Sequence, residues 1–532
     1  MDTKDVLVVG AGPVGLTAAC QLARLGVTVR VVDKLDRPTT ESRAVTVHAR
    51  SMEMLAPLGA LPRMMARGRR VDGLAMVDGP TGRTRARIDF AEVPSRYPFL
   101  LDIAQPDSEA VLGERAAELG IVVERGVELT ALTQDDDGVE VTLRSGDRDE
   151  RTERVGWVVG ADGGHSPTRH LVGARLEGDF HGQTFAMADV EVDTDLSRDT
   201  IRMFTHADGM GIFFPLLDTR ARIMFFVDPP GPDAGDPTLE QIRTLADARM
   251  GGRLRVHDPR WLTYFEIHHA QVPRYRHGRV LLAGDAAHIH SPAGAQGMNT
   301  GIQDAANLGW KLALVARGRA DAALLDSYHD ERHPVGADVV RTTTALTSVG
   351  TASGAAASVR DAALFLVGHA HRLGDALAAK TAEVTIAYRH SALSVQHGGH
   401  PRGPVRAGDH APDPDGLRRA DGSAVTVEQL LATPGLLLLA RTDEADTVDA
   451  LRRELGDLGR VVQVVPAAGP AAGDDVVVDP DGVVAARYGL SPEGLALVRP
   501  DGYLGLVADT ADADLVRRYL TDTLGVAEPA TR

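Results

Sequence analysis

The sequence predicts an α/β protein in which a nucleotide-binding parallel sheet is interrupted by a mostly antiparallel sheet and followed by a small α/β domain. Residues 5–33 show a buried strand, a glycine-rich turn, a helix and a second strand. Residues 176–275 change to short strands separated by turns, and the strand-then-helix pattern returns at Val280. A segment rich in glycine and proline, residues 397–416, then separates a last group of strands and helices.

The chain length requires several domains, because 532 residues exceed what one hydrophobic core supports. We expect the segment 73–100 to lie partly on the side of the inserted sheet. The expected divisions are residues 1–175 for the first part of the nucleotide-binding domain, 176–275 for the inserted sheet, 276–396 for the second part with a helical segment, and 403–527 for the C-terminal domain.

Composition excludes several classes of function. The net charge of −17 argues against binding to nucleic acid or to an anionic membrane surface. No apolar run reaches the roughly 18 residues that a transmembrane helix needs. Cys20 is the only cysteine, so neither an intramolecular disulfide nor a cysteine-rich metal site can form. We therefore expect a cytoplasmic protein without a bound metal.

The first motif, Gly10-x-Gly12-x-x-Gly15, follows the strand "DVLVVG". Gly10 permits a tight turn, Gly12 lets a pyrophosphate approach the backbone, and Gly15 permits close packing of helix on strand. Pro13 opens the helix, whose N-terminus directs N–H groups at the phosphates. Asp33 ends the second strand, where a carboxylate binds an adenosine ribose. The motif predicts a dinucleotide site but does not distinguish FAD from NAD.

Two later motifs also place glycine and aspartate after a buried strand. The first, Gly160-Ala161-Asp162-Gly163 with Ser166 and Arg169, is also explained by an Asp-Gly turn with a helix cap. The second, "AGDAAHIHSPAGAQGMN", contains Asp285 and Pro292 and leads into a helix at Gly297, Met298 and Asn299. That helix N-terminus favours negative charge. We expect His288 and His290 to be structural or solvent-facing, and "HDERH" at 329–333 to be a solvated helix face.

The order and spacing of the three motifs resemble the class A flavoprotein monooxygenases of the para-hydroxybenzoate hydroxylase type, over about residues 1–345. The resemblance implies a Rossmann-like domain with non-covalent FAD. It assigns the ADP moiety to the first motif, FAD and the pyridine nucleotide to Asp162 and Gly163, and the ribityl chain to Asp285. It further assigns flavin contacts to Arg43 in "SRAVTVHARSMEML" and to Gln105 in "LDIAQPDSEAVL".

The C-terminal segments "DPDGVVAARYGL" and "ALVRPDGYLG" resemble the thioredoxin-like domain of the phenol-hydroxylase and aromatic-polyketide-hydroxylase branch. Without cysteine this domain cannot perform dithiol chemistry. We expect it to serve packing or oligomerisation, which allows a homodimer. We also expect it to be separable in fold, so that a chain ending near Gly403 keeps its FAD if that chain is soluble.

The resemblance implies that NADPH or NADH reduces FAD, that O2 forms a flavin C4a-hydroperoxide, and that oxygen is transferred to a polycyclic, polyketide-type aromatic substrate. The apolar strands "GMGIFFPLL" and "ARIMFFV" indicate a pocket wall with Phe213, Pro215 and Phe225, together with Pro292, although packing in a core explains these strands as well. Arg220 and Arg222 are interpreted as solvent-facing, and no catalytic residue is identified. A Baeyer–Villiger oxygenase on the same fold and a non-oxygenating or non-catalytic flavoprotein remain as alternatives.

Overall fold

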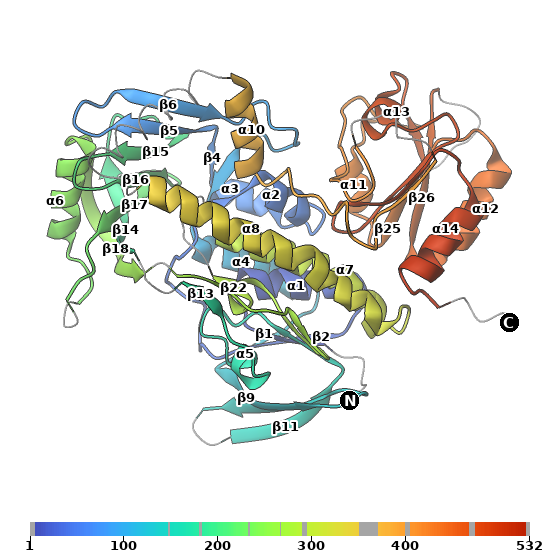
Figure 1. The fold of residues 1–532 in the computed structure, drawn as a ribbon, viewed down its shortest axis with the longest axis horizontal. Coiled ribbons are helices and arrows are strands. Elements are labelled where there is room, and N and C mark those ends of the chain that lie inside the picture. The colour runs from blue at the N-terminus through green and yellow to red at the C-terminus, as the bar shows by residue number, and fades with distance from the viewer. Residues whose placement is uncertain are drawn as a thin grey trace.

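The computed structural model describes residues 6–146, 149–179, 183–231, 235–266, 268–289, 295–350, 371–398, 405–467 and 474–527. It is a mixed α/β protein in which a C-terminal domain lies beside a larger N-terminal part (Figure 1). Among these residues, no helix is both long and apolar enough to cross a lipid bilayer.

The first sheet has the strand order β20-β21-β12-β1-β2-β8 and is parallel except at the β20 edge. Its strands are β1 (Val6–Val9), β2 (Val29–Asp33), β8 (Val123–Arg125), β12 (Trp157–Gly160), β20 (Arg276–His277) and β21 (Val280–Leu282). The central strands are short runs rich in valine and leucine, as expected for strands buried on both faces. Their parallel register brings the carboxyl ends of β1, β12 and β21 to one edge.

Different layers cover the two faces of this sheet. The helices α1 (Pro13–Arg24), α4 (Gln105–Glu118) and α7 (Gly297–Ala316) pack together on one face. The other face shares an apolar cluster with a small antiparallel sheet, formed by β9 (Val127–Gln134), β10 (Val139–Ser145) and β11 (Asp149–Val155).

A second, seven-stranded sheet has the order β18-β14-β17-β16-β15-β5-β6. Its strands are β5 (Gly73–Asp78), β6 (Thr84–Asp89), β14 (Thr184–Asp193), β15 (Thr200–Thr205), β16 (Gly211–Pro215), β17 (Arg220–Val227) and β18 (Arg255–Glu266). All neighbours are antiparallel except β15 and β5. The helix α6 (Leu239–Met250) covers one face, and we call this sheet the inserted sheet (Figure 1).

Small sheets and helices connect these two layers. One small sheet joins β3 (Thr46–Val47), β7 (Leu100–Asp102) and β4 (Arg69–Val71), and another joins β13 (Glu177–Asp179), β19 (His269–Gln271) and β22 (His288–Ile289). Further helices are α2 (Ala49–Leu55), α3 (Leu61–Arg67), α5 (Pro167–Leu171), α8 (Asp326–Gly350) and α10 (His371–Thr381), with short helical turns η1 (Gly284–Ala286) and η2 (Ala322–Leu325).

The C-terminal domain contains a seven-stranded mixed sheet with the order β23-β29-β28-β25-β26-β27-β24. Its strands are β23 (Val395–His397), β24 (Arg418–Arg419), β25 (Leu436–Ala440), β26 (Gly459–Val465), β27 (Val476–Val478), β28 (Leu495–Val498) and β29 (Leu504–Ala508). Its helical elements are α11 (Val427–Leu431), α12 (Ala445–Leu455), η3 (Gly456–Leu458), α13 (Val483–Tyr488), α14 (Ala513–Arg518) and η4 (Tyr519–Thr523).

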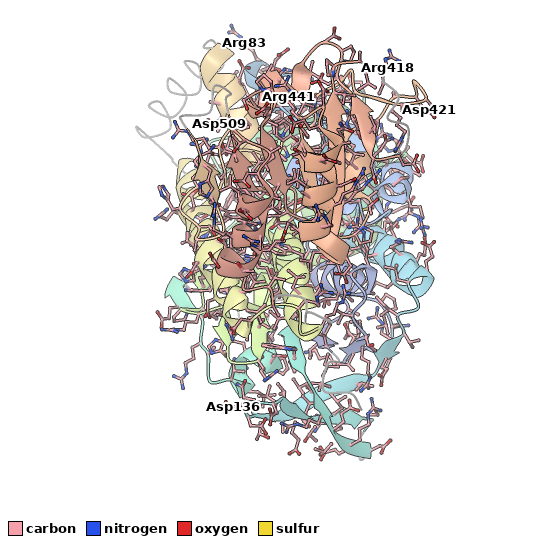
Figure 2. The ribbon with its side chains drawn as sticks, turned by 90° about the vertical axis from the view of Figure 1, so that its right-hand side faces the viewer. Arg83, Asp136, Arg418, Asp421, Arg441 and Asp509 are labelled. Atoms are coloured by element: carbon pink, nitrogen blue, oxygen red, sulfur yellow. The ribbon has the colours of Figure 1, made fainter. Side chains whose placement is uncertain are left out.

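The C-terminal domain is not packed independently of the rest. In Figure 2 it faces the viewer, with Arg441 and Asp509 on it and Asp136 at the far lower end of the molecule. One of its apolar clusters includes Trp310 of α7 and Leu324 of η2. The expectation that this domain is separable stays a prediction, and the shared cluster weighs against it because removal of the domain would expose apolar side chains of the N-terminal part.

Candidate functional site

The three glycine-bearing turns that the sequence singles out meet at one edge of the first sheet. The Ala161 amide donates to the Val9 carbonyl at 2.8 Å, and the Ala283 amide donates to the Gly160 carbonyl at 2.9 Å. The buried Arg169 guanidinium donates to the carbonyls of Gly164 at 2.7 Å and Ala286 at 3.3 Å. These bonds join segments more than a hundred residues apart into one site.

The first glycine turn combines close backbone contacts with open space. A Cβ at Gly10 would lie 2.3 Å from the Ala161 oxygen, and one at Gly15 would lie 2.0 Å from the Gly10 oxygen. A Cβ at Gly12, in contrast, would meet no atom within 4 Å. No side chain caps the N-terminus of α1, where Pro13 is the first residue. The turn therefore leaves room and free N–H groups for an anionic group beside Gly12.

Asp33 closes the same turn from the end of β2. One carboxylate oxygen accepts a hydrogen bond from the Ala11 amide at 2.7 Å, and the other accepts from the Leu35 amide at 2.8 Å. Arg125 lies 3.6 Å from the carboxylate. Because each carboxylate oxygen has a second lone pair, these bonds leave capacity to bind a ribose hydroxyl.

Asp285 lies in the turn that follows β21, which we call the GD turn (residues 283–289). Its side chain is exposed, although protein atoms surround it, and this partial desolvation raises the pKa of its carboxyl. His288 and Arg43 act in the opposite direction and lower that pKa. The GD turn needs Gly284, whose φ is +60° and whose Cβ would lie 2.9 Å from Val14. An open carboxylate in a recess is suited to accept hydrogen bonds from a ligand.

Arg43 and Gln105, to which the resemblance assigns flavin contacts, lie close together. The Gln105 side-chain oxygen accepts from the amides of Arg43 at 3.1 Å and Ala44 at 3.2 Å, and its nitrogen donates to Glu109 at 3.0 Å. The Arg43 guanidinium is exposed and pairs with Glu41. In this structure Gln105 thus fixes the backbone of the segment that carries Arg43. Burial raises the pKa of the neighbouring Glu109 to about 7.

Asp162 is engaged by its own turn. Its carboxylate accepts from the hydroxyl of Ser166 and from both the amide and the hydroxyl of Thr168, at 2.8 and 2.7 Å. Ser166 in turn caps α5 by accepting from the Arg169 amide. The adjacent Gly163 has φ +78°, and a Cβ there would meet nothing within 4 Å. The structure therefore gives Asp162 a role in shaping the turn, and leaves open space beside Gly163.

The N-terminus of α7 reaches the same region. Gly297, Met298 and Asn299 form its first turn, which no side chain caps. The Asn299 oxygen accepts from the His48 amide, and its nitrogen donates to the carbonyls of Thr46 and Ala295, each at 2.8 Å. Asn299 therefore fixes the helix terminus against β3, and no side chain of the described residues caps that terminus. Pro292 and His290 lie outside the described residues.

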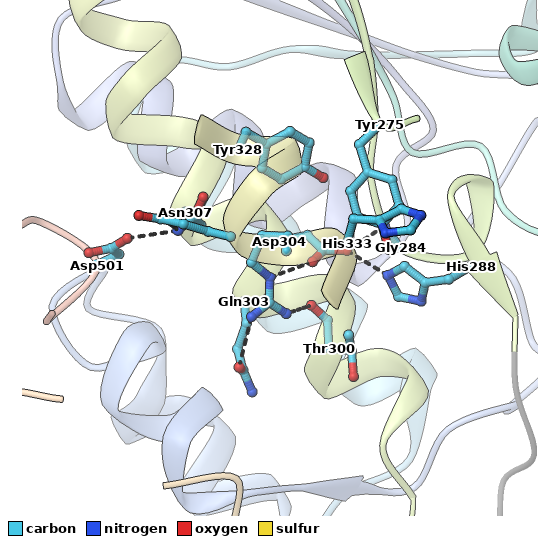
Figure 3. Close-up of polar contacts among 12 residues, drawn as sticks. Tyr275, Gly284, His288, Thr300, Gln303, Asp304, Asn307, Tyr328, His333 and Asp501 are labelled. Atoms are coloured by element: carbon cyan, nitrogen blue, oxygen red, sulfur yellow. Dashed lines mark hydrogen bonds and ion pairs between the residues drawn. The ribbon is translucent and has the colours of Figure 1, made fainter. Parts of the chain in front are cut away.

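Beneath the GD turn lies a group that the sequence did not single out, the Asp304 cluster: Asp304, His288 and Arg332. All three side chains are fully buried. Asp304 accepts from the Gly284 amide at 3.1 Å, from Arg332 at 2.7 Å, and contacts the His288 ring nitrogen at 2.7 Å. Figure 3 shows His288 and Asp304 facing each other beside Gly284. The cluster holds the GD turn against α7 and α8.

The inserted sheet turns one of its faces toward this site. Phe213 and Phe225 lie on the opposite face, in the apolar cluster under α6, and strand alternation places Pro215 there too. This placement argues against Phe213, Pro215 and Phe225 as pocket residues. The apolar side chains that pack toward the first sheet are Phe185, Met187, Ile212, Phe214, Met224 and Phe226.

The interpretation of Arg222 as solvent-facing is wrong. Arg222 is 1% exposed and donates twice to Asp189 across neighbouring strands, at 2.7 and 2.9 Å. The alternation of β17 places this pair on the same face as Met224 and Phe226. Arg220, beside the turn, is half-buried and lies 3.7 Å from Asp107.

Comparison with protein-family models identifies residues 3–343 as a match to the family described as FAD binding domain. The chain belongs to this family. Curated relatives of this chain are monooxygenases, and together with the family match they assign it to the FAD-dependent aromatic monooxygenases.

Two curated relatives and one solved structure illustrate the family. The chain is 37% identical over 523 residues to 6-methylpretetramide 4-monooxygenase of Streptomyces rimosus, covering 94% of this chain and 90% of the relative. It is 34% identical to pentachlorophenol 4-monooxygenase of Sphingobium chlorophenolicum, covering 96% and 95%. The fold matches an aklavinone-11 hydroxylase solved with FAD and aklavinone, with TM-score 0.78, 26% identity and coverage of 98% and 99%.

The geometry of the site residues fits FAD. The open space beside Gly12 and the uncapped α1 terminus suit the pyrophosphate, and the recessed Asp285 carboxylate suits a ribityl chain. The uncapped terminus of α7 suits negative charge on the ring system. Gly12 and Asp285 could be selected from the sequence because each lies in a glycine-bearing turn that follows a strand.

Sequence reasoning missed the buried charges of α8. The segment "HDERH" was interpreted as a solvated helix face, yet Glu331 is 3% and Arg332 is 0% exposed. The rings of His329 and His333 pack against Tyr275, with centroid separations of 6.0 and 5.5 Å. A signal was present in α7, where Asp304 follows Gly301 by three residues, so both lie on the face that approaches the GD turn.

Proposed function

We propose that this FAD-dependent monooxygenase hydroxylates a large, mostly apolar polycyclic phenol, with NADPH or NADH as reductant and O2 as oxidant. The observation that carries the substrate class is the inner face of the inserted sheet, which presents Phe185, Ile212, Phe214 and Phe226 toward the flavin-binding part. Such a wall gains from burying fused rings, at about 25 cal/mol per Å2 of apolar surface.

The charge on that face also favours a substrate without a carboxylate. Arg222 is a buried cation on that face, and its guanidinium donates to both carboxylate oxygens of Asp189. A benzoate would have to compete with Asp189 for this guanidinium or bury its own charge unpaired, which is costly. A phenol makes no such demand.

The residues of this chain prepare the site for chemistry that FAD supplies. When bound, FAD accepts a hydride from the nicotinamide and activates O2 for transfer to the ring. Asp285 would hold the ribityl chain, and the N-terminus of α7 would stabilise negative charge on the flavin ring. The apolar face of the inserted sheet would exclude water, which protects the oxygen transfer from wasteful release of peroxide.

The test is steady-state NADPH oxidation with matched panels of single-ring hydroxybenzoates, pentachlorophenol, and phenols of three or four fused rings. We expect the fused-ring phenols to stimulate oxidation, with O2 uptake matched by hydroxylated product. Tight coupling with hydroxybenzoates and none with the fused-ring phenols would contradict the substrate class. Product in which oxygen is inserted into a ring bond would instead identify a Baeyer–Villiger oxygenase.

A further inference from the structure

A second buried charge cluster lies where the C-terminal domain meets α7 and α8, and we call it the interdomain cluster: Lys311, Glu331, Arg499 and Asp501. None of the four side chains is more than 3% exposed. Arg499 donates to both oxygens of Glu331 at 2.7 and 2.8 Å and to Asp501 at 2.6 Å. Lys311 donates to Glu331 at 2.7 Å. Two cations and two anions thus form a neutral buried group.

Two uncharged side chains of α7 also donate hydrogen bonds to the carboxylates of the interdomain cluster. The Asn307 amide nitrogen donates to Glu331 at 2.7 Å and to Asp501 at 3.2 Å. The Trp310 indole N–H donates to Asp501 at 3.1 Å. The carboxylate of Asp501, from the C-terminal domain, therefore binds two residues one turn apart on the helix whose other end reaches the flavin site.

The interdomain cluster and the Asp304 cluster share both helices. On α8, Glu331 belongs to the first and the next residue, Arg332, to the second. On α7, Asp304 and Asn307 lie one turn apart, and Figure 3 shows Asn307 directed toward Asp501 while Asp304 faces His288. Each helix is thus held by charge from two sides.

Tyr388 forms a direct contact between the two clusters. Its hydroxyl accepts a hydrogen bond from Arg332 at 2.9 Å, and the Arg499 guanidinium lies 5.5 Å from its ring centroid. Arg332 also donates to the Thr300 carbonyl in the first turns of α7 at 3.0 Å. A continuous buried path of named contacts therefore runs from Arg499 through Tyr388 and Arg332 to Asp304 and the Gly284 amide.

We propose that Arg499 and Asp501 of the C-terminal domain are positioning residues for the flavin, acting through α7, α8 and Asp304 on the turn that carries Asp285. The inference rests on the proposed placement of the ribityl chain at Asp285. Its physical basis is that a buried ion pair tolerates little displacement, because loss of one partner leaves an uncompensated charge. A shift of either helix at Asp501 would therefore move Gly284 and Asp285 with it.

The experiment measures FAD binding to protein stripped of its flavin, by the quenching of flavin fluorescence. Arg499→Gln and Asp501→Asn should each raise the FAD dissociation constant about tenfold, and Tyr388→Phe, which removes one hydroxyl, about threefold. The flavin midpoint potential should shift in the same three variants. Folding of each stripped protein is checked by its thermal unfolding, so that affinity is compared only among folded chains.

The matched control is Arg319→Gln. Arg319 pairs with Asp457 across the same domain boundary at 2.6 Å, but both side chains are partly exposed, and within the described residues neither side chain forms a hydrogen bond with α8. Its removal should leave the FAD dissociation constant and the midpoint potential unchanged. An Arg319→Gln effect equal to that of Asp501→Asn would overturn the inference, since any loosening of the boundary would then suffice.

The variant Asp285→Ala tests separately whether the ribityl chain binds at Asp285, the placement on which this inference rests. If Asp285→Ala loses FAD while folded cluster variants bind it like the wild type, the inference alone is overturned. If Asp285→Ala binds FAD normally, the placement fails and the inference with it. Should Arg499→Gln and Asp501→Asn not fold, Tyr388→Phe decides, and an unchanged dissociation constant in that variant overturns the inference.

Discussion

The flavin site and the domain boundary handle polar groups in opposite ways. At the flavin site, Asp285 is exposed in a recess, Gly12 borders open space, and the first turns of α1 and α7 lack side-chain caps. At the boundary, Glu331 and Arg499 are buried and paired with each other and with further charges. Polar groups without a hydrogen-bond partner in the protein can bind a ligand, whereas buried polar groups that are fully paired hold the chain in one arrangement.

The largest effect expected from this comparison is that of deleting the C-terminal domain. A chain ending at Gly398 would lose Arg499 and Asp501 and expose Trp310, Lys311 and Glu331. Loss of one side of a buried charge group costs about 3–5 kcal/mol, a large part of the stability of a domain. We expect the truncated chain to be unfolded or to lack flavin.

The measurement is the ratio of flavin to protein absorbance in the purified truncated chain, with its unfolding transition. A folded truncated chain that holds a full complement of FAD would show that the boundary does not support the flavin site. It would restore the expectation, drawn from sequence, that the domain is separable.

Asp285→Ala should have the next largest effect, and on affinity rather than on folding. No hydrogen bond to the Asp285 side chain is formed within the described residues, so its loss should leave the unfolding midpoint of the stripped protein nearly unchanged. Each ribityl hydroxyl left unpaired costs about 1–3 kcal/mol, so FAD affinity should fall at least tenfold.

Acid precipitation of the wild-type protein should release its flavin into the supernatant, as expected for non-covalent FAD.

The contrast between the two regions also shows what the sequence can predict. The flavin site is built from strand ends and glycines that are local in sequence, and the positions of Gly10, Asp162 and Asp285 at one edge follow from parallel strands. The boundary is built from contacts between residues 311, 331 and 499, which no local pattern relates. The segment "HDERH" therefore looked like a polar surface.

In the inserted sheet, the sequence-based prediction was wrong about which face of the sheet each side chain occupies. The segment "GIFFP" is apolar at every position because both faces of the sheet are covered, so alternation cannot show which face Phe213 or Phe214 occupies. The prediction that Arg222 faces solvent was wrong for a related reason. Its partner Asp189 is set by the pairing of β14 with β17, and sequence places Arg222 only near a turn.

Asp102 is a third case, because its side chain is buried like the charges at the domain boundary but does not form an ion pair. One oxygen accepts from the Thr46 hydroxyl at 2.6 Å, and the other has no hydrogen-bond partner among the described residues. Burial raises the pKa of this carboxyl from 3.8 to about 8, with Arg222 acting in the opposite direction. Between these values the unfolded chain loses the proton and the folded chain keeps it, so stability falls as pH rises toward about 8.

Asp102→Asn should remove this pH dependence, because the amide oxygen still accepts from Thr46 and nothing titrates. As the pH rises from about 5 to about 8, the stability of the variant should rise relative to that of the wild type by about 1 kcal/mol for each pH unit. Urea unfolding at a series of pH values measures this. A constant difference across that range would mean that Asp102 is ionised in the folded protein.

The smallest effect is expected at Asp162, which belongs to the flavin site by position but resembles the boundary in being fully bonded. Its carboxylate accepts three hydrogen bonds from Ser166 and Thr168, so Asp162→Ala should lower stability by about 1 kcal/mol through loss of the turn and the α5 cap. FAD affinity should fall less than in Asp285→Ala, since Asp162 would act on the ligand only through the shape of its turn. Parallel titrations of both variants with FAD, and NADPH oxidation by the FAD-loaded Asp162→Ala protein, provide the measurement. If Asp162→Ala loses more FAD than Asp285→Ala, the open carboxylate is not the main protein contact of the flavin, and the distinction between open and fully bonded groups does not identify ligand-binding residues in this protein.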